Sequence, residues 1–271
     1  MPEANAGQGQ AGLLAAADPA PFTLINAEGR PEILLICDHA ARAVPDALRR
    51  LGLDEATLAR HIGWDIGAAA VTLALAERLG APAVLSGYSR LVIDCNRTLD
   101  DPTSIPTISD GMPIPGNQEL SAAEKRARAE ACFWPYQRAI EAQLVRAAGL
   151  GVAPAIISIH SFTPHLQGRD RPWHVGILWD SDPRIPLPLI AGLAGLPGLV
   201  VGDNQPYSGR DPEGFTLEHH AIPRGLPHVL IELRQDAIDT AAGAQLFAEH
   251  LEAALKPILA DPELYRPALY R

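Results

Sequence analysis

The sequence has no cluster of lysines or arginines, and its formal net charge is −10 over 271 residues. Proteins that bind a phosphate backbone rely on clustered cations that release counterions, so we expect no nucleic-acid partner. No basic residue precedes Arg30, and the apolar patch before it is short. This pattern predicts neither a secretory signal nor a membrane-spanning segment, so we expect no membrane partner either.

Cysteine is scarce. Cys37, Cys95 and Cys132 are odd in number and far apart in the chain. Such spacing favours reduced, buried thiols over a disulfide framework, which is typical of small secreted domains. We therefore expect a reducing, cytoplasmic compartment.

Apolar runs alternate with segments rich in Ala, Leu, Glu and Arg. Strands are predicted at 32–37, 81–87, 90–95, 155–160, 173–179, 198–203 and 228–234, and helices over 64–80, 121–148 and 240–259. Continuous apolar strands between helices predict an α/β fold whose largely parallel sheet is covered on both faces. The Ala/Gly/Pro/Gln-rich segment 1–21 is expected to be a flexible leader, and 22–271 a single domain.

Polar side chains gather where the predicted strands end. In open α/β sheets, ligands bind beyond the carboxyl ends of the strands. Five predicted strands end in or contain such residues, namely Asp38 and His39, Asn96 and Arg97, His160, Asp203 and Asn204, and Glu232. The sequence therefore predicts one polar site at an edge of the sheet.

Two of these residues, His39 and His160, are candidate metal ligands. Catalytic zinc sites use three His or carboxylate ligands and keep a fourth position for water. The other interpretation is two strand-end histidines with ordinary hydrogen bonds. For a third ligand, Asp65 opens the helix that follows the loop after His39, while His61 is a weaker alternative. Asp38 is also an alternative, although its adjacency to His39 favours a supporting partner of a ligand.

Glu232 and Arg97 each have two interpretations. A carboxylate inside an apolar strand costs free energy unless it is paired, so Glu232 is either an ion-pair partner of Arg234 or a general base beside a metal-bound water. Arg97 is either a structural salt-bridge partner or a bidentate clamp for a substrate carboxylate.

Seven sequence blocks carry a family resemblance. Between about residues 31 and 240 they run in the order "CDHAARAVP", "HIGWDIGA", "SRLVIDCNRTLDDP", "SIHSFTP", "DNQPYSG", "GFTLEHHA" and "HVLIELRQD". This order resembles the N-formylglutamate amidohydrolase family and, more remotely, zinc carboxypeptidases and aspartoacylase-type deacylases. One departure from carboxypeptidases is that their His-x-x-Glu pair has no counterpart here, because Arg42 stands three residues after His39.

The resemblance implies a three-layer α/β/α fold with a mixed, largely parallel sheet of the zinc-carboxypeptidase type. It implies one Zn²⁺ per chain, or another divalent metal, bound by His39, Asp65 and His160. Glu232 would act as the general base for a metal-bound water.

The implied substrate is a small molecule with a carboxylate. Arg97 and Asn96 would hold that carboxylate, with Arg42, Tyr207 and Asn204 as further contacts. The implied reaction is N-formyl-L-glutamate plus water to formate plus L-glutamate, a step that would serve histidine breakdown. The sequence indicates no particular oligomeric state.

Other activities stay open at this point. One is a related zinc deacylase, amidase or small-peptide hydrolase acting on a different N-acyl amino acid, and another is a catalytically inactive binding protein. A serine hydrolase with Ser161 as nucleophile is disfavoured, because the glycines of a nucleophile elbow are missing. The long Pro-rich loop 100–117 is interpreted either as a lid over the substrate or as a surface bracket.

Overall fold

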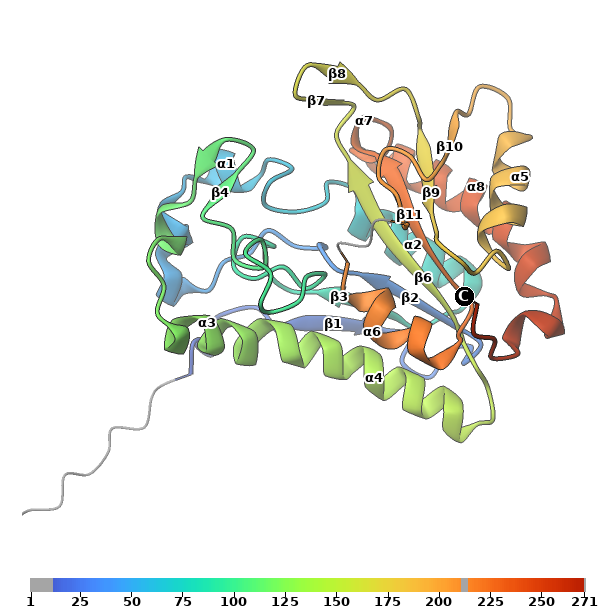
Figure 1. Cartoon of the computed structure of the whole chain (residues 1–271), viewed down its shortest axis with the longest axis horizontal. Coiled ribbons are helices and arrows are strands. Elements are labelled where there is room, and N and C mark those ends of the chain that lie inside the picture. The colour runs from blue at the N-terminus through green and yellow to red at the C-terminus, as the bar shows by residue number, and fades with distance from the viewer. Residues whose placement is uncertain (1–11, 211–213, 271) are drawn as a thin grey trace, which may run out of the picture.

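The computed structural model describes residues 12–210 and 214–270. A seven-stranded sheet forms its centre, in the order β1-β3-β2-β6-β11-β9-β10 (Figure 1). Its strands are β1 (Phe22–Ile25), β2 (Ile33–Cys37), β3 (Ala83–Ser86), β6 (Ala155–Phe162), β9 (Val175–Leu178), β10 (Val201–Asp203) and β11 (His228–Arg234). Two small antiparallel pairs stand apart from it: β4 (Ile108–Ser109) with β5 (Met112–Pro113), and β7 (His165–Leu166) with β8 (Arg169–Asp170).

Strand directions make the sheet mixed but largely parallel, which confirms the expected α/β class. β3, β2, β6 and β11 are mutually parallel, while β1 is antiparallel to β3 and β9 is antiparallel to β11. β10 runs parallel to β9, so its carboxyl end lies at the opposite edge from those of β2, β6 and β11. The rule that polar residues converge at carboxyl ends is therefore confirmed for the central strands and wrong for β10.

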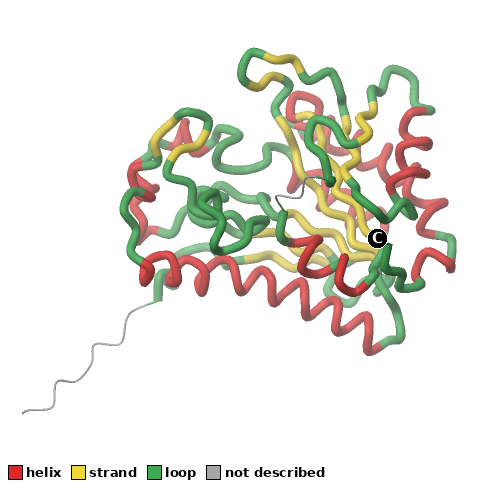
Figure 2. Tube along the Cα trace, viewed as in Figure 1, coloured by secondary structure: helices red, strands yellow, loops and turns green. Residues whose placement is uncertain are grey.

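Helices cover both faces of the sheet (Figure 2). The helices are α1 (Glu55–Leu58), α2 (Ala68–Leu79), α3 (Ala122–Arg128), α4 (Trp134–Gly149), α5 (Pro186–Ala194), α6 (Thr216–His220), α7 (Gln235–Ile238) and α8 (Ala241–Leu259). Because successive strand side chains point to opposite faces, Leu35 joins a core with α2, α5 and α8, whereas Leu34 joins a second core with α4. Burial on both faces explains the continuous apolar runs.

The helix expected over 121–148 is present with one interruption. It begins with a capping box between Ser121 and Glu124, as the sequence predicts. Between α3 and α4, residues Ala129–Phe133 form a π-helical turn. Pro135 is the second residue of α4. Because proline lacks an N–H and clashes with the carbonyl four residues earlier, the wider turn before it accommodates this residue.

The strand expected at 90–95 is wrong. This segment consists of turns, and Leu91, Val92 and Ile93 are buried in a core cluster outside the sheet. The apolar run at 90–95 therefore indicates that these residues are buried. It does not distinguish a buried strand from a buried turn. Cys95 consequently does not end a strand, although it and the other two cysteines are free and buried as expected.

Residues near the start of the described chain contact two segments that flank the sheet. The backbone N–H of Asp46 donates to Asp18, and the Tyr88 hydroxyl donates to the Pro19 carbonyl. Asp18 and Pro19 of the expected leader 1–21 are thus hydrogen-bonded to other segments, while residues 1–11 lie outside the described residues.

Loop 100–117 is tied to its surroundings. The Asn117 side-chain amide donates to the carbonyls of Leu91 and Pro106, and Arg128 donates to the Gly116 carbonyl. These contacts fit a surface bracket, and the role of a lid stays a prediction.

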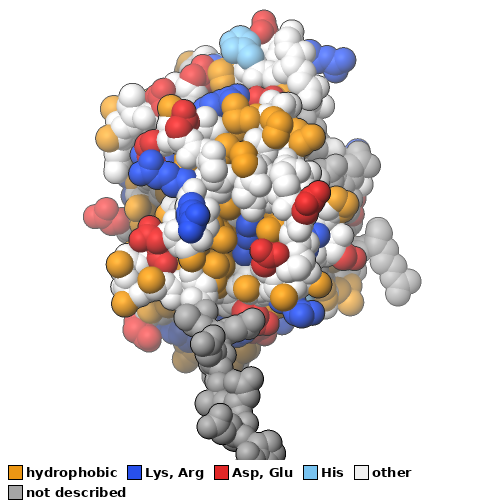
Figure 3. Space-filling model, turned by 90° about the vertical axis from the view of Figure 1, so that its left-hand side faces the viewer, with side chains coloured by type: hydrophobic (Ala, Val, Ile, Leu, Met, Phe, Trp, Pro, Cys, Tyr) orange, Lys and Arg blue, Asp and Glu red, His pale blue; other side chains and the backbone are white. Residues whose placement is uncertain are grey.

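Acidic and basic side chains are interspersed on the face that Figure 3 shows. On that face the Lys and Arg side chains lie among Asp and Glu and apolar groups, without a single basic patch. Among the helices of residues 12–210 and 214–270, none is long and apolar enough to cross a membrane.

Candidate active site

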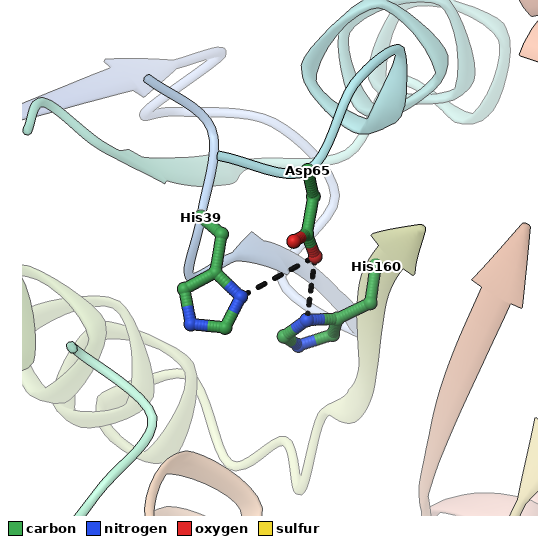
Figure 4. A group of neighbouring side chains, drawn as sticks. All are labelled: His39, Asp65 and His160. Carbon is green, nitrogen blue, oxygen red and sulfur yellow. Dashed lines mark hydrogen bonds and ion pairs between the residues drawn. The ribbon is translucent and has the colours of Figure 1, made fainter. Parts of the chain in front are cut away.

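Three predicted ligands meet at the carboxyl edge of the central strands. His39 follows β2, His160 lies in β6 and Asp65 precedes α2. The Oδ2 atom of Asp65 lies 3.3 Å from Nδ1 of His39 and 3.0 Å from Nδ1 of His160, so the carboxylate stands between the two imidazoles (Figure 4). One donor atom from each residue lies within 4.8 Å of the others, and all three are buried. This group could hold a metal ion.

Local backbone geometry positions Asp65. Its N–H donates to the His39 carbonyl at 3.0 Å, which fixes the loop after β2 against the start of α2. Gly67 then takes φ 81°, and a Cβ there would lie 2.4 Å from the Ile238 carbonyl oxygen. Only glycine allows this turn to pack so closely, and the turn directs Asp65 toward the histidines.

Each histidine is held by a second carboxylate through its other ring nitrogen. Nε2 of His39 lies 2.7 Å from Asp94, and Nε2 of His160 lies 3.0 Å from Asp38. With Nε2 hydrogen-bonded to a carboxylate, Nδ1 of each histidine is the atom that could bind a metal, and a partner of this kind fixes the tautomer of metal-binding histidines. The structure thus places Asp38 as the partner of a candidate ligand. Asp94 was missed, because the apparent strand 90–95 seemed to enclose it.

Both supporting carboxylates are themselves fixed. Asp38 accepts hydrogen bonds from the hydroxyls of Tyr136 at 3.0 Å and Thr216 at 2.6 Å. Asp94 accepts from Arg90 at 2.7 Å and from the backbone N–H of Asn96 at 2.8 Å. Arg90 also lies 3.5 Å from Asp65, and sequence reasoning did not single it out.

The cluster concentrates negative charge where water is excluded. Burial opposes ionisation of Asp38, Asp65 and Asp94, yet their cationic and hydrogen-bonding neighbours hold the pKa of each carboxyl below its usual value. Burial alone would lower the pKa of His160, but hydrogen bonds to Asp38 and Asp65 raise it to about 10. Positive charge therefore stabilises the group, and either protonated imidazoles or a bound cation would supply it. Two imidazole nitrogens and a carboxylate oxygen form a donor set typical of catalytic zinc.

Glu232 lies beside this cluster. It is in register with His160 on the neighbouring strand, and its side chain is 7% exposed. Its Oε2 atom has no hydrogen-bond partner among the described residues, and burial raises the pKa of the carboxyl to about 7. Arg234, the alternative ion-pair partner, pairs with Asp236 at 2.7 Å instead. A buried carboxyl of this kind is suited to exchanging a proton.

A cavity of about 430 Å³ joins the cluster to Glu232 and to three expected substrate contacts. Arg97, Asn96 and Tyr207 line it. Asn96 Oδ1 accepts from the backbone N–H groups of Phe215 and Thr216, so this residue also anchors the start of α6. The Tyr207 hydroxyl accepts from Arg171 at 3.0 Å.

Two other expected substrate contacts do not line this cavity. Arg42 lies 3.3 Å from Glu55 and borders a separate depression. Asn204 Oδ1 accepts from the backbone N–H groups of Trp179 and Gly209, at 3.0 and 2.9 Å. Asn204 therefore shapes the loop that carries Tyr207 rather than facing the cavity.

The structure does not support Ser161 as a nucleophile or His61 as a metal ligand. The Ser161 hydroxyl donates to the Ile66 carbonyl at 2.9 Å and accepts from Gln235, while the ring nitrogens of His160 face Asp38 and Asp65. No base among the described residues is therefore placed to activate Ser161. His61 lies 3.5 Å from Asp110 and is not part of the metal-binding group.

The chain is similar to proteins of one named family. A family model described as N-formylglutamate amidohydrolase matches residues 32–238. Two curated relatives are named N-formylglutamate deformylase. That of Pseudomonas aeruginosa is 29% identical over 224 residues, covering 76% of this chain and 82% of the relative. That of Pseudomonas putida is 28% identical over 225 residues, covering 77% and 82%.

Solved structures show the same fold. A gene product of Agrobacterium tumefaciens has a TM-score of 0.88 and 35% identity, covering 93% of this chain and 99% of that one. An N-formylglutamate amidohydrolase from Ralstonia eutropha has a TM-score of 0.61 and 18% identity, covering 88% and 97%.

Proposed function

Because the chain belongs to the N-formylglutamate amidohydrolase family, we propose that it is a zinc-dependent amidohydrolase that converts N-formyl-L-glutamate and water to formate and L-glutamate. One observation carries the proposal: His39, Asp65 and His160 converge within 4.8 Å, in the cavity that Glu232 also lines. The names of the two Pseudomonas relatives support the hydrolytic activity.

In this proposal, three residues bind the metal and a fourth, Glu232, transfers a proton. His39, Asp65 and His160 would hold the zinc, and Asp94 and Asp38 keep the two imidazoles oriented through their Nε2 atoms. The bound metal would supply Lewis-acid polarisation of the amide carbonyl and lower the pKa of water from about 15.7 toward 7. Glu232 would accept a proton from the attacking water and pass it to the leaving amine.

Binding of the substrate carboxylate falls to Arg97 in this proposal. Its guanidinium presents a planar fork of donors, which matches a carboxylate. Arg97 lines the cavity with Asn96, whose backbone carbonyl accepts from Nη1 of Arg97 at 3.0 Å. Tyr207 would contact the substrate from the facing loop.

Metal analysis paired with an activity assay tests the proposal. We expect about one zinc per purified chain by elemental analysis, and formate release from N-formyl-L-glutamate that stops on chelation and returns with zinc. Zinc without formate release would redirect the search to other N-acyl amino acids. A protein that binds no metal and gains no activity from added metal would contradict the proposal.

A further inference from the structure

Arg171 is a half-buried cation whose side-chain partner is a tyrosine. Its guanidinium forms no ion pair with an Asp or Glu side chain in residues 12–210 and 214–270. Instead, Nη1 of Arg171 donates to the hydroxyl oxygen of Tyr207 at 3.0 Å. The guanidinium also lies 4.9 Å from the centre of the Tyr207 ring, within the range of a cation–π interaction. Because Tyr207 lines the cavity, Arg171 contacts the cavity wall from behind.

The segment that carries Arg171 is fixed to the sheet. The N–H of Arg171 donates to the Pro164 carbonyl at 2.8 Å, which closes the loop that contains β7 and β8 beyond the tip of β6 (Figure 1). The neighbouring Pro172 carbonyl accepts from Nη1 of Arg234, the last residue of β11, at 3.2 Å. The guanidinium of Arg171 lies 5.9 Å from the centre of the Phe162 ring, at the end of β6. Arg171 is therefore held from the carboxyl ends of β6 and β11.

The direction of the hydrogen bond determines what the Tyr207 hydroxyl can offer. A guanidinium only donates, whereas a phenol hydroxyl has one O–H donor and acceptor lone pairs. Tyr207 therefore accepts from Arg171 and keeps its own O–H for another partner. Among the described residues, no acceptor for that O–H lies within hydrogen-bond distance. The hydroxyl hydrogen is thus available to an acceptor on a ligand in the cavity.

The charged groups around Tyr207 leave its phenol protonated. Burial and the Glu232 carboxylate raise the pKa of Tyr207, while Arg171 and Arg90 lower it. The resulting pKa lies above the usual value of a phenol, so Tyr207 is a donor at neutral pH. N-formyl-L-glutamate has acceptors of the matching kind in its amide carbonyl and its carboxylates.

We propose that Arg171 is a positioning residue for the proposed hydrolysis, because it holds the Tyr207 hydroxyl by its oxygen and leaves the O–H directed at an oxygen of the bound substrate. Arg171 is not among the described residues that line the cavity, so it acts through Tyr207. The inference rests on the proposed function and adds a residue to it. The competing role is purely structural, in which Arg171 only attaches the loop after β10 to the segment after β8.

A double-mutant cycle separates these two roles. Arg171→Met keeps an unbranched side chain but removes its donors and its charge, while Tyr207→Phe keeps the ring and removes the hydroxyl. On the zinc-loaded full chain we expect each change to lower kcat/KM for N-formyl-L-glutamate by about tenfold, as for one hydrogen bond to the substrate. Because both changes remove the same interaction, the double variant should be about as active as either single variant. Losses that multiply in the double variant overturn the inference.

The division of the loss between KM and kcat gives a second readout. A hydroxyl that binds substrate and transition state equally changes KM, whereas one that donates to charge developing in the transition state changes kcat. Whichever parameter Tyr207→Phe alters, Arg171→Met should alter the same one. A change in the other parameter, or unmodified kinetics in either variant, overturns the inference and leaves the proposed hydrolysis intact.

Arg169→Met is the matched control. Arg169 is exposed on β8, two residues before Arg171, and its side chain has no ion-pair or hydrogen-bond partner among the described residues. Losing this charge should leave KM and kcat unchanged. Equal losses in Arg169→Met and Arg171→Met would show that the charge of the segment matters rather than the bond to Tyr207, which overturns the inference. If Arg171→Met does not fold, Arg171→Lys replaces it in the cycle, because lysine keeps the charge but lacks the planar fork of donors.

Titration of the Tyr207 phenol tests the contact without turnover. The near-ultraviolet absorbance of tyrosinate, taken as the difference between a chain and the same chain with Tyr207→Phe, isolates one of the five tyrosines. Removing a neighbouring cation destabilises the phenolate, so Arg171→Met should raise the pKa of Tyr207 above that in the unmodified chain, and Arg169→Met should not. An unchanged pKa in Arg171→Met overturns the inference whatever the chain hydrolyses. Absence of formate release from the unmodified chain, by contrast, contradicts the proposed function.

Discussion

Glutamine has nearly the same size and shape as glutamate, but it cannot accept a proton. Glu232→Gln therefore tests proton transfer separately from metal binding. The side chain is buried beside His160 but is not one of the three candidate ligands. We expect kcat to fall by about 10²–10⁴ with zinc content unchanged, measured by formate release and elemental analysis. Glu249→Gln is the control, because Glu249 pairs with Arg78 on the surface. Near-normal turnover in Glu232→Gln would exclude the general-base role.

A second residue-scale prediction concerns the carboxylate behind His39. Asp94→Asn keeps an oxygen for the Nε2–H of His39 but removes the negative charge that also pairs with Arg90. Supporting carboxylates of this kind contribute about 10–100-fold to metal affinity, so zinc should bind more weakly by that factor. Competition with a chelating dye measures the change. Asp110→Asn, a surface change near Arg60, is the comparison, and equal zinc affinity of the two variants would refute the prediction.

The sequence was informative about residues whose role depends on strand position. His39, Asp65 and His160 follow from strand ends and family blocks, and the structure brings them together. Arg42 and Asn204 could not be placed, because the direction of a loop side chain depends on tertiary contacts that a linear pattern does not contain. Arg42 turns to Glu55, and Asn204 turns to its own loop.

At the scale of elements, continuous apolar runs identified β2, β6 and β11 because both faces of these strands are buried. The same signal misidentified 90–95, where the apolar side chains fill a core cluster without strand pairing. The sequence also did not predict that β9 runs antiparallel to β11. Strand direction depends on how the connecting segments cross the sheet, and a linear pattern does not contain that information. The loop after β10 packs against Gly176, the residue of β9 that pairs with Glu232, and Tyr207 of this loop lines the same cavity as Glu232.

Gly176 permits that loop to approach the sheet. A Cβ at this position would lie 1.9 Å from the Gln205 carbonyl oxygen, so Gly176→Ala must displace the loop that carries Tyr207. We expect a loss of about 1–3 kcal/mol in unfolding free energy, as for other overpacked sites, and a raised KM. Denaturant melts and substrate kinetics would measure these changes. Gly149→Ala is the control, because nothing lies within 4 Å of the added methyl group there. Identical behaviour of the two variants would show that the loop does not depend on Gly176.

Across the whole molecule, the candidate ligands come from distant parts of the chain. Asp65 lies 26 residues after His39 and 95 residues before His160. An unfolded chain does not present these donors together, so metal binding and folding are thermodynamically coupled. Asp38, Asp65 and Asp94 remain ionised in the buried cluster, which gives a bound cation a stabilising role that surface charges would not provide.

Zinc should therefore raise the thermal stability of the chain. A metal that binds only the folded state adds RT ln(1 + [L]/Kd), or about 2.7 kcal/mol at a hundred times Kd. For a chain of this size about 1 kcal/mol shifts Tm by roughly 2–4 °C, so we expect Tm to rise by about 5–10 °C. Melting the chelated protein with and without added zinc measures the shift, and His160→Ala should abolish it. Because the ligands span β2, the start of α2 and β6, a melting temperature independent of zinc would mean that the cluster holds no metal in the folded chain.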